Sequence, residues 1–374
     1  MKKQLIEPRL IGRRFDDHTI PLEVLKDISV LEEFIIAVAK WLYVQDHDGR
    51  VRSPKGFAAA LSIALSGVRN GSAIPAIAFS YDDGTGGLLP PANEEYFVRA
   101  TECIGRAIDA AVYKENITQH VPTALLGYFD RFGRSLRDGE ALELFPNSIR
   151  KGTLTKPTRR LLLLASQNQI ITDEIIIRGL VPEINQNRMS FEIQTPGGRK
   201  IDVKMDAVHL DTILEATNGY RNGIKISVKG VGRYDRTGRL QSIESIEEVV
   251  IIDMNDPLAR IDELRLLKDG WLDGIGLAPK ASDLDWLEHF FSERFPSSCY
   301  PFIYPTEEGG VQLEWESKSH DISIKLDFRR KAVEVHDLSS EQEEDWFEEF
   351  SLENFERLEQ TINKSVKFVM DDIQ

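Results

Sequence analysis

The spacing of apolar residues follows a helical period in some stretches of the chain and a strand period in others. Between residues 27 and 46, apolar side chains recur every three or four positions, which predicts an amphipathic helix. Two apolar runs then flank Asn70-Gly71, a dipeptide typical of β-hairpins. A second amphipathic helix is predicted within residues 93–115. We therefore expect residues 1–170 to form an α+β domain, with helices on a small sheet.

The middle of the chain is rich in β-branched residues with partial alternation, which is the pattern of β-strands. A short helix is predicted at residues 207–220, between the third and fourth of five strand segments. Five strands with one helix at that place indicate a small closed barrel. We expect this barrel-like domain to span residues 171–253. The five predicted strands are residues 173–184, 188–195, 199–205, 223–235 and 240–252.

Residues 254–374 are expected to form a third α+β domain. Its clearest helix runs from Ser282, a capping residue, to Pro296, which stops it. The stretch YPTEEGGVQLEWES, from Tyr304 to Ser317, then combines a loop with an alternating apolar strand. Two more alternating segments follow, so we predict a three-stranded antiparallel meander backed by this helix. Beyond residue 340, aromatic residues at mixed helical spacings predict an acidic C-terminal helix.

Composition supports a globular, multi-domain α+β protein. The chain has 374 residues, of which 41% are hydrophobic and 29% charged, and this length suits two or three domains. No apolar run approaches the roughly 18–20 residues that a membrane span needs. The N-terminal stretch lacks the apolar core of a secretion signal, and the two cysteines, Cys103 and Cys299, lie far apart. We expect a cytoplasmic protein that does not bind membranes.

The formal net charge of −15 is concentrated in the last third of the chain. Residues 1–177 hold 22 acids and 22 bases, and residues 178–252 hold 10 acids and 11 bases. Residues 253–374 hold 29 acids and only 13 bases. An acidic region of this kind attracts basic partners and repels phosphate, although solubility alone is an equally good explanation.

The chain carries none of the motifs that mark catalysis or cofactor binding. There is no phosphate-binding loop, because Gly230 and Gly232 are followed by another strand segment rather than by a helix. The adjacent Asp46, His47 and Asp48 cannot all face one metal ion. We therefore expect no catalytic residue, metal site or cofactor. An enzyme whose site is assembled from residues distant in sequence stays open as a third alternative.

The leading hypothesis is a non-enzymatic protein that regulates another protein by binding it through the acidic last third. Trp346 is the candidate aromatic anchor, and a solvated helix that packs Trp346 inward is the alternative. The candidate partner-binding residues are Glu341, Glu343, Glu344, Asp345, Trp346, Glu348, Glu349 and Glu353.

Nucleic-acid binding by the middle domain is the second hypothesis. A barrel with a basic groove and a tyrosine for stacking suits a single strand, but the region is close to neutral and the calculated pI is about 5.1. A basic rim that docks on the acidic region of the same chain is the alternative. The candidate residues are Arg188, Lys229, Arg233, Tyr234, Arg236 and Arg239.

Residues 260–338 resemble a segment of an uncharacterised bacterial protein family. The resemblance consists of a Gly-Trp-x-Asp-Gly step, a helix, a Tyr-Pro-Thr-x-Glu-Gly-Gly-Val turn and an acid-Trp-acid strand. It implies an accessory or neutralising component of a bacterial defence or toxin–antitoxin module. The matching residues are Gly270, Trp271, Asp273, Gly274, Tyr304, Pro305, Thr306, Glu308, Gly309, Gly310, Val311, Glu314 and Trp315.

Overall fold

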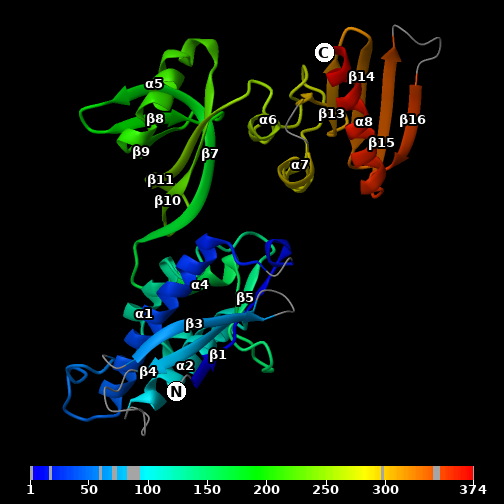
Figure 1. The fold of residues 1–374 in the computed structure, drawn as a ribbon. Coiled ribbons are helices and arrows are strands. Elements are labelled where there is room, and N and C mark those ends of the chain that lie inside the picture. The colour runs from blue at the N-terminus through cyan, green and yellow to red at the C-terminus, as the bar shows by residue number, and fades with distance from the viewer. Residues whose placement is uncertain are drawn as a thin grey trace. The chain divides into compact units, whose positions relative to one another are not determined.

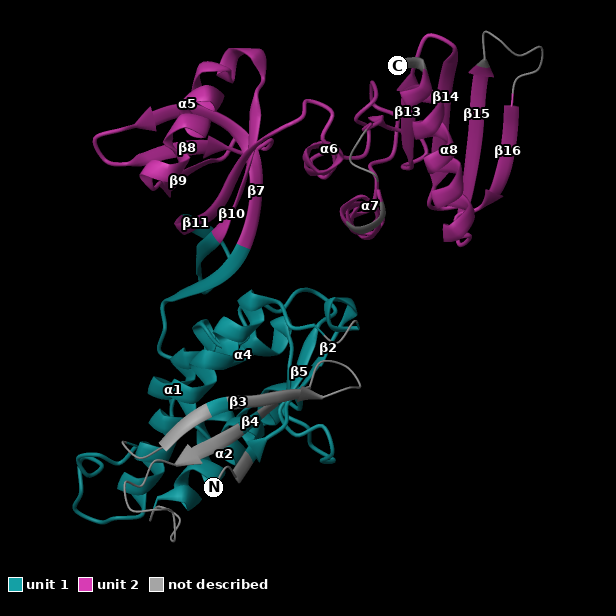
Figure 2. Ribbon diagram, viewed as in Figure 1, with its two compact units in different colours: residues 1–174, 231–242 teal, residues 175–230, 243–374 magenta. Residues whose placement is uncertain are grey.

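The computed structural model describes residues 3–16, 19–58, 61–69, 74–81, 93–295, 299–339 and 346–373. The chain forms two compact units, coloured separately in Figure 2. The first unit comprises residues 1–174 and 231–242, and the second comprises residues 175–230 and 243–374. The end of one hairpin from the middle of the chain therefore belongs to the first unit.

The first unit packs helices against two small antiparallel sheets (Figure 1). One sheet has the strand order β1-β4-β3 and the other the order β2-β5-β6. Its elements are β1 (Lys3–Ile6), β2 (Arg9–Ile11), α1 (Leu22–Gln45), β3 (Leu61–Arg69), β4 (Ile74–Tyr81), α2 (Glu94–Val112), α3 (Thr123–Leu126), β5 (Ala141–Glu143), β6 (Thr153–Leu154) and α4 (Lys156–Ala165).

Helix α1 carries the core of the first unit. Its apolar stripe is buried, with Phe34, Ile35 and Val38 fully covered, as the helical period predicts. The helix begins several residues before the predicted start, directly after Pro21, whose extended conformation suits the residue that precedes a helix. The hairpin predicted at Asn70-Gly71 is confirmed by the antiparallel pairing of β3 and β4 around these two residues, which themselves lie outside the described part.

The middle of the chain forms the predicted five-stranded barrel, closed in the order β10-β11-β9-β8-β7. The chain passes through three antiparallel strands and one helix before β10 and β11 complete the ring, and β11 pairs with β9 in parallel. Its elements are β7 (Ile170–Asn185), β8 (Ser190–Gln194), β9 (Lys200–Lys204), α5 (Leu210–Asn218), β10 (Lys225–Asp235) and β11 (Leu240–Ile252).

Glycines permit close contact between barrel strands. A Cβ atom on Gly230 would lie 2.1 Å from the carbonyl oxygen of Ser245, and one on Gly179 would lie 2.3 Å from that of Gln194. A side chain at either position would therefore force neighbouring backbone apart. Gly230 lies within β10 rather than in a turn, so its role is to allow strand contact.

The C-terminal part is a five-stranded antiparallel meander, in the order β12-β13-β14-β15-β16. Helix α8 lies across one face of the sheet (Figure 1), and apolar residues of α6, α7 and α8 share a core with this face. Its elements are α6 (Pro257–Leu264), α7 (Ala281–Arg294), β12 (Phe302–Pro305), β13 (Val311–Glu316), β14 (His320–Asp327), β15 (Ala332–Ser339), β16 (Trp346–Ser351) and α8 (Phe355–Ile373).

The C-terminal part differs from the sequence prediction at two strands and one helix cap. The meander has five strands rather than three, because β12 pairs along β13 and β16 pairs along β15. The acidic helix predicted beyond residue 340 is instead a strand followed by α8, since pairing with β15 prevails over the helical spacing of the aromatic residues. Ser282 does not cap α7, which is preceded by Lys280 without a side-chain cap. Within the described residues, no helix has the length and apolarity that crossing a membrane requires.

Candidate functional site

Those predicted partner-binding residues that the structure describes lie on or just after β16, an edge strand of the C-terminal sheet. Glu341, Glu343, Glu344 and Asp345 lie outside the described residues. Trp346 is half-buried on β16, packed against the core, and the ammonium of Lys364 lies 3.6 Å from its ring centre. The tryptophan therefore contacts its own chain on the inner side of the sheet.

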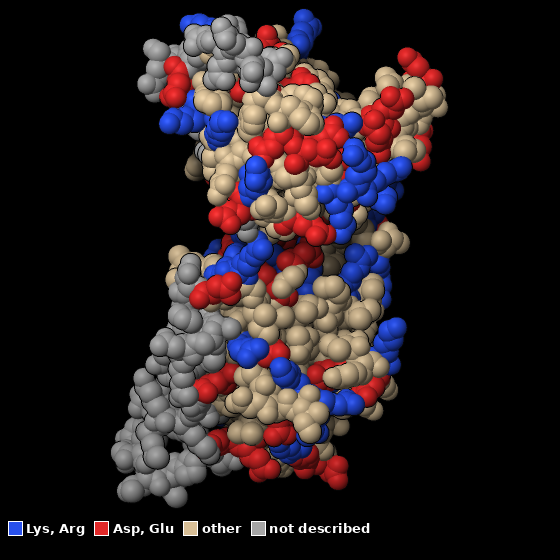
Figure 3. Space-filling view, turned by 90° about the vertical axis from the view of Figure 1, so that its right-hand side faces the viewer, with Lys and Arg blue, Asp and Glu red and all other residues tan. Residues whose placement is uncertain are grey.

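The remaining acidic candidates each pair with a base of the same chain. Glu348 pairs with Arg357. Glu349 lies 3.4 Å from Arg330. Glu353 lies 2.7 Å from Lys331, and this hydrogen bond lowers the pKa of Glu353. On the face shown in Figure 3, acidic and basic side chains are interspersed.

A more distinct surface lies on the side of the sheet opposite α8, and we call it the open face. Residues directly opposite one another in neighbouring strands point to the same side, and buried and exposed positions alternate along β13, β14 and β15. Four large apolar side chains of the open face are 44–59% exposed. They are Phe302 and Tyr304 on β12, Leu338 on β15 and Phe347 on β16.

Acidic residues share the open face with these apolar side chains. Glu316 and Asp321 face each other across β13 and β14, and neither has an ion pair among the residues described. Glu334 lies opposite Glu349, and Arg330 bridges the two at 2.9 and 3.4 Å. The open face thus combines exposed aromatic rings with carboxylates that are only partly neutralised.

The candidate nucleic-acid residues are divided between the two units. Arg188 is exposed in the turn after β7, and Lys229 lies 3.6 Å from Glu247. Both belong to the second unit. The other four candidates lie in the first unit, and they are Arg233, Tyr234, Arg236 and Arg239. Arg236 donates to the carbonyl oxygens of Leu164, Ser166 and Asn168, at the end of α4. Its guanidinium therefore has a structural role there.

Proteins that bind single strands stack the bases on exposed aromatic side chains. Neighbouring strands β8 and β9 form one part of the barrel wall. Their aromatic residue, Phe191, is only 2% exposed, and Lys200 on β9 pairs with Glu192 on β8 at 2.8 Å. This surface therefore lacks the stacking platform of single-strand binders. Nucleic-acid binding stays a prediction.

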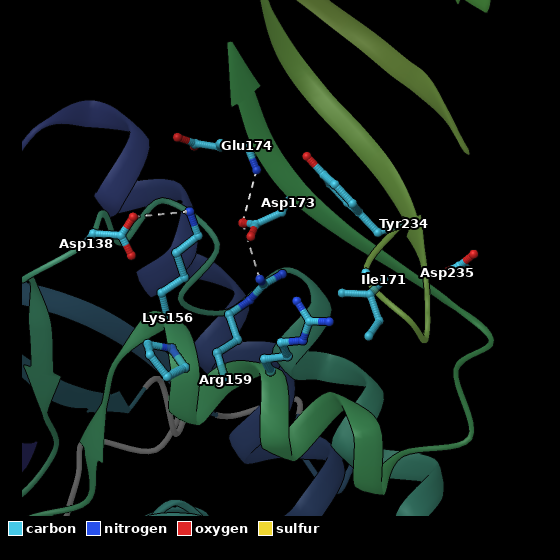
Figure 4. Close-up of a pocket in the computed structure, with 11 residues that line it drawn as sticks. Asp138, Lys156, Arg159, Ile171, Asp173, Glu174, Tyr234 and Asp235 are labelled. Atoms are coloured by element: carbon cyan, nitrogen blue, oxygen red, sulfur yellow. Dashed lines mark hydrogen bonds and ion pairs between the residues drawn. The ribbon is translucent and has the colours of Figure 1, made fainter. Parts of the chain in front are cut away.

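A cavity of about 400 Å³ lies within the first unit, between α4 and the end of the β10–β11 hairpin (Figure 4). The side chains of Lys156, Asp173 and Tyr234 border it from three different elements. It was missed at the level of sequence because residues 138–174 meet residues 234–238 only after folding. The full lining is Asp138, Lys156, Pro157, Arg159, Arg160, Ile171, Asp173, Glu174, Tyr234, Asp235 and Gly238.

Arg159 lines the cavity, and its guanidinium already binds groups of the protein itself. Its side chain is 2% exposed and donates to the carbonyl oxygens of Phe129, Asp130 and Thr172 at 2.7–2.8 Å. Burial lowers the pKa of this guanidinium. Its Nη1 lies 3.4 Å from Asp173, which also accepts from the backbone N–H of Glu174 (Figure 4). Arg159 and Asp173 thus largely neutralise each other.

Three polar groups at the cavity stay available to a ligand. Arg160 is exposed and has no ion pair within the described part of the chain. Lys156 forms an ion pair only with Asp138 among the residues that the structure describes, at 3.9 Å, and that carboxylate is 88% exposed. The hydroxyl of Tyr234 has no hydrogen bond to a described residue, and burial together with the charge of Asp173 raises its pKa to about 12. Tyr234 therefore acts as a neutral donor.

Comparisons of the chain with protein-family models, with curated proteins and with solved structures find no match.

Proposed function

We propose that this protein binds a basic partner protein on the open face of its C-terminal sheet and regulates that partner without catalysis. The observation that carries the proposal is the exposure of Phe302, Tyr304, Leu338 and Phe347 on one sheet face, each at least 44% exposed. Two of them lie on the edge strand β12, and the other two lie on β15 and on the opposite edge strand β16. Aromatic residues are enriched at protein interfaces, where polar side chains accompany them.

The charges around the apolar residues favour a basic partner. Glu316 and Asp321 lie opposite each other without a neutralising base among the described residues, an arrangement that costs the isolated protein stability. Lysine or arginine side chains of a partner would relieve this repulsion on binding. Complementary charge would also speed the encounter of the two proteins.

Neutralisation of a basic toxin or nuclease is the specific form of regulation that we propose. The support is the chemistry of the open face together with the sequence resemblance of residues 260–338. An acidic surface that covers the basic substrate-binding region of a nuclease would block it directly.

Affinity capture with defined variants tests the proposal. The full chain, Phe347→Asp and the double variant Glu316→Lys/Asp321→Lys are used as baits in lysate from the native cell. Val208→Asp serves as the control, because Val208 is 86% exposed in the short helix after β9 and is not part of the C-terminal sheet. Each captured protein is identified by mass spectrometry, purified and re-bound to the same variants.

The expected result is a basic protein whose binding is lost in both open-face variants and retained in Val208→Asp. Binding should also weaken as salt rises from about 0.05 to about 0.5 M, because rim charges are screened. A partner that binds all the variants equally, or whose binding does not respond to salt, would contradict the proposal.

A further inference from the structure

We propose that the cavity between α4 and the β10–β11 hairpin binds a small organic phosphate. The phosphate group is held by Arg160 and Lys156. The organic body, a planar ring system, lies against Ile171 and the ring of Tyr234. This site belongs to the first unit and is independent of the open face, so it adds a small-molecule ligand to the proposed protein partner.

The two cations lie on the same side of α4. Lys156 and Arg160 are four residues apart in a helix, so their side chains are neighbours, and both line the cavity. Like charges at this spacing destabilise a helix unless an anion lies between them. Four carboxylates also line the cavity, those of Asp138, Asp173, Glu174 and Asp235. Asp138 lies 3.9 Å from Lys156 but is exposed, Asp173 is paired with Arg159, and Asp235 accepts hydrogen bonds within its own turn.

The hairpin end positions Arg160. A Cβ atom on Gly238 would lie 2.4 Å from an Nη atom of Arg160, so the guanidinium rests directly against the glycine. Gly238 also has a φ of +86°, which other residues rarely adopt. Asp235 shapes this turn, since its carboxylate accepts from the backbone N–H groups of Thr237 and Arg239 at 2.9 and 3.0 Å.

A phosphate ester fits these groups better than a carboxylate. A planar guanidinium and a flexible ammonium are the usual protein ligands of phosphate, and two cations match its double charge. The helix start contributes little, because Pro157 lacks an N–H and the hydroxyl of Thr155 already accepts from Thr158. The side chains, rather than the helix end, therefore provide the positive charge.

The rest of the cavity requires an organic body. A volume of about 400 Å³ is far larger than a bare phosphate ion needs. Ile171 provides an apolar wall and Tyr234 a half-buried ring (Figure 4). The Tyr234 hydroxyl and the carboxylate of Asp173 offer one donor and one acceptor for polar atoms of the ligand. A nucleoside monophosphate has this combination of size, ring and charge.

Calorimetric titration of the full chain with AMP, phenyl phosphate, adenosine and inorganic phosphate tests the site. AMP or phenyl phosphate should bind, and inorganic phosphate and adenosine should bind at least about tenfold more weakly, which is about 1.4 kcal/mol. Arg160→Ala and Lys156→Ala should each weaken binding at least tenfold. Tyr234→Leu should remove the advantage of the ring-bearing phosphates over inorganic phosphate.

Arg106→Ala is the control, because Arg106 is an exposed arginine of α2 that pairs with Glu102 in its own helix and does not line the cavity. It should leave binding unchanged, and circular dichroism should show that every variant is folded. The proposal is overturned if neither phosphate ester binds, if Arg160→Ala binds as tightly as the parent, or if inorganic phosphate binds as tightly as AMP. Binding of a single-stranded oligonucleotide without binding of AMP would also overturn it, in favour of a nucleic-acid strand.

Discussion

Glu316 and Asp321 lie directly opposite each other in the antiparallel register of β13 and β14, and both carboxylates are exposed. Neither has an ion pair in the described part of the chain. Like charges in directly opposed positions destabilise a sheet. A conflict of this kind is expected where a surface serves binding rather than stability.

Reversing one of these charges should stabilise the protein. Glu316→Lys converts a repulsive pair into an attractive one, and we expect the free energy of unfolding to rise by about 0.5–1 kcal/mol at low salt. Urea denaturation at low and high salt measures this change, which should shrink as the salt screens it. Glu307→Lys, on the exposed loop before β13, should change stability far less. A loss of stability in Glu316→Lys would contradict this interpretation.

Two arginines of one hairpin should behave very differently. Arg236 donates to three carbonyl oxygens after α4, so Arg236→Ala should lower the free energy of unfolding by about 1–3 kcal/mol. Arg233 is exposed and has no side-chain partner among the described residues. Arg233→Ala should therefore change the free energy of unfolding by less than about 0.5 kcal/mol. Thermal or urea denaturation compares the two, and equal effects would refute the capping role.

Stability should depend on pH through Glu263 of α6. Burial opposes its charged form, but hydrogen bonds from Lys225 and Arg260 outweigh this effect and hold its pKa below the ordinary value. The ionised carboxylate therefore stabilises the fold above the ordinary pKa of glutamate, and this contribution is lost as pH falls through the lowered value. Glu263→Gln should cost about 1–2 kcal/mol near pH 7 and progressively less as the pH falls through the lowered pKa of Glu263.

Urea denaturation across this pH range provides the measurement for Glu263. Glu244→Gln is the matched control, because Glu244 is exposed on β11 and has no partner in the part of the chain that the structure describes. Its effect should be small at every pH. A cost of Glu263→Gln that stays constant with pH would show that the carboxylate charge is not responsible.

Two glycines of the barrel should differ in their tolerance of alanine. Gly230→Ala places a methyl group 2.1 Å from the carbonyl oxygen of Ser245, so we expect a loss of about 1–3 kcal/mol. Gly197→Ala meets only the flexible side chain of Leu266 at 3.5 Å and should change stability by less than about 0.5 kcal/mol. Denaturation of both variants measures the two changes in the free energy of unfolding. Equal losses would mean that the close contact of β10 with β11 is unimportant.

Much of the local structure could be predicted from the sequence. The five barrel strands and the helix between the third and fourth agree with the structure, because β-branched alternation and turn residues act over short distances. The strand β12 was missed because it contains Pro305, which an edge strand tolerates. The strand β16 was taken for a helix because Trp346 and Phe350 are four residues apart, a helical spacing that two positions on one side of a strand also satisfy.

The candidate sites were less accessible to such reasoning. The open face depends on which strands are neighbours, so nothing local indicates that Phe302 and Phe347 share one surface. The cavity brings Arg160 beside Gly238 across a long stretch of intervening chain. The one local hint of the cavity in the sequence was the pair Arg159-Arg160 just before an apolar run. Neighbouring residues of a helix point in different directions, and here Arg159 is buried while Arg160 is exposed at the cavity.

By itself, the sequence determined the periods, the turns and the uneven distribution of charge, and hence an α+β chain with a barrel and an acidic last third. The tertiary structure alone decided how the barrel closes, which acids are neutralised and which apolar residues stay exposed. The physical reason is that periodicity and turn chemistry act between residues a few positions apart. Strand pairing, burial and ion pairing join residues far apart in the sequence, and their energies exist only once the chain has folded.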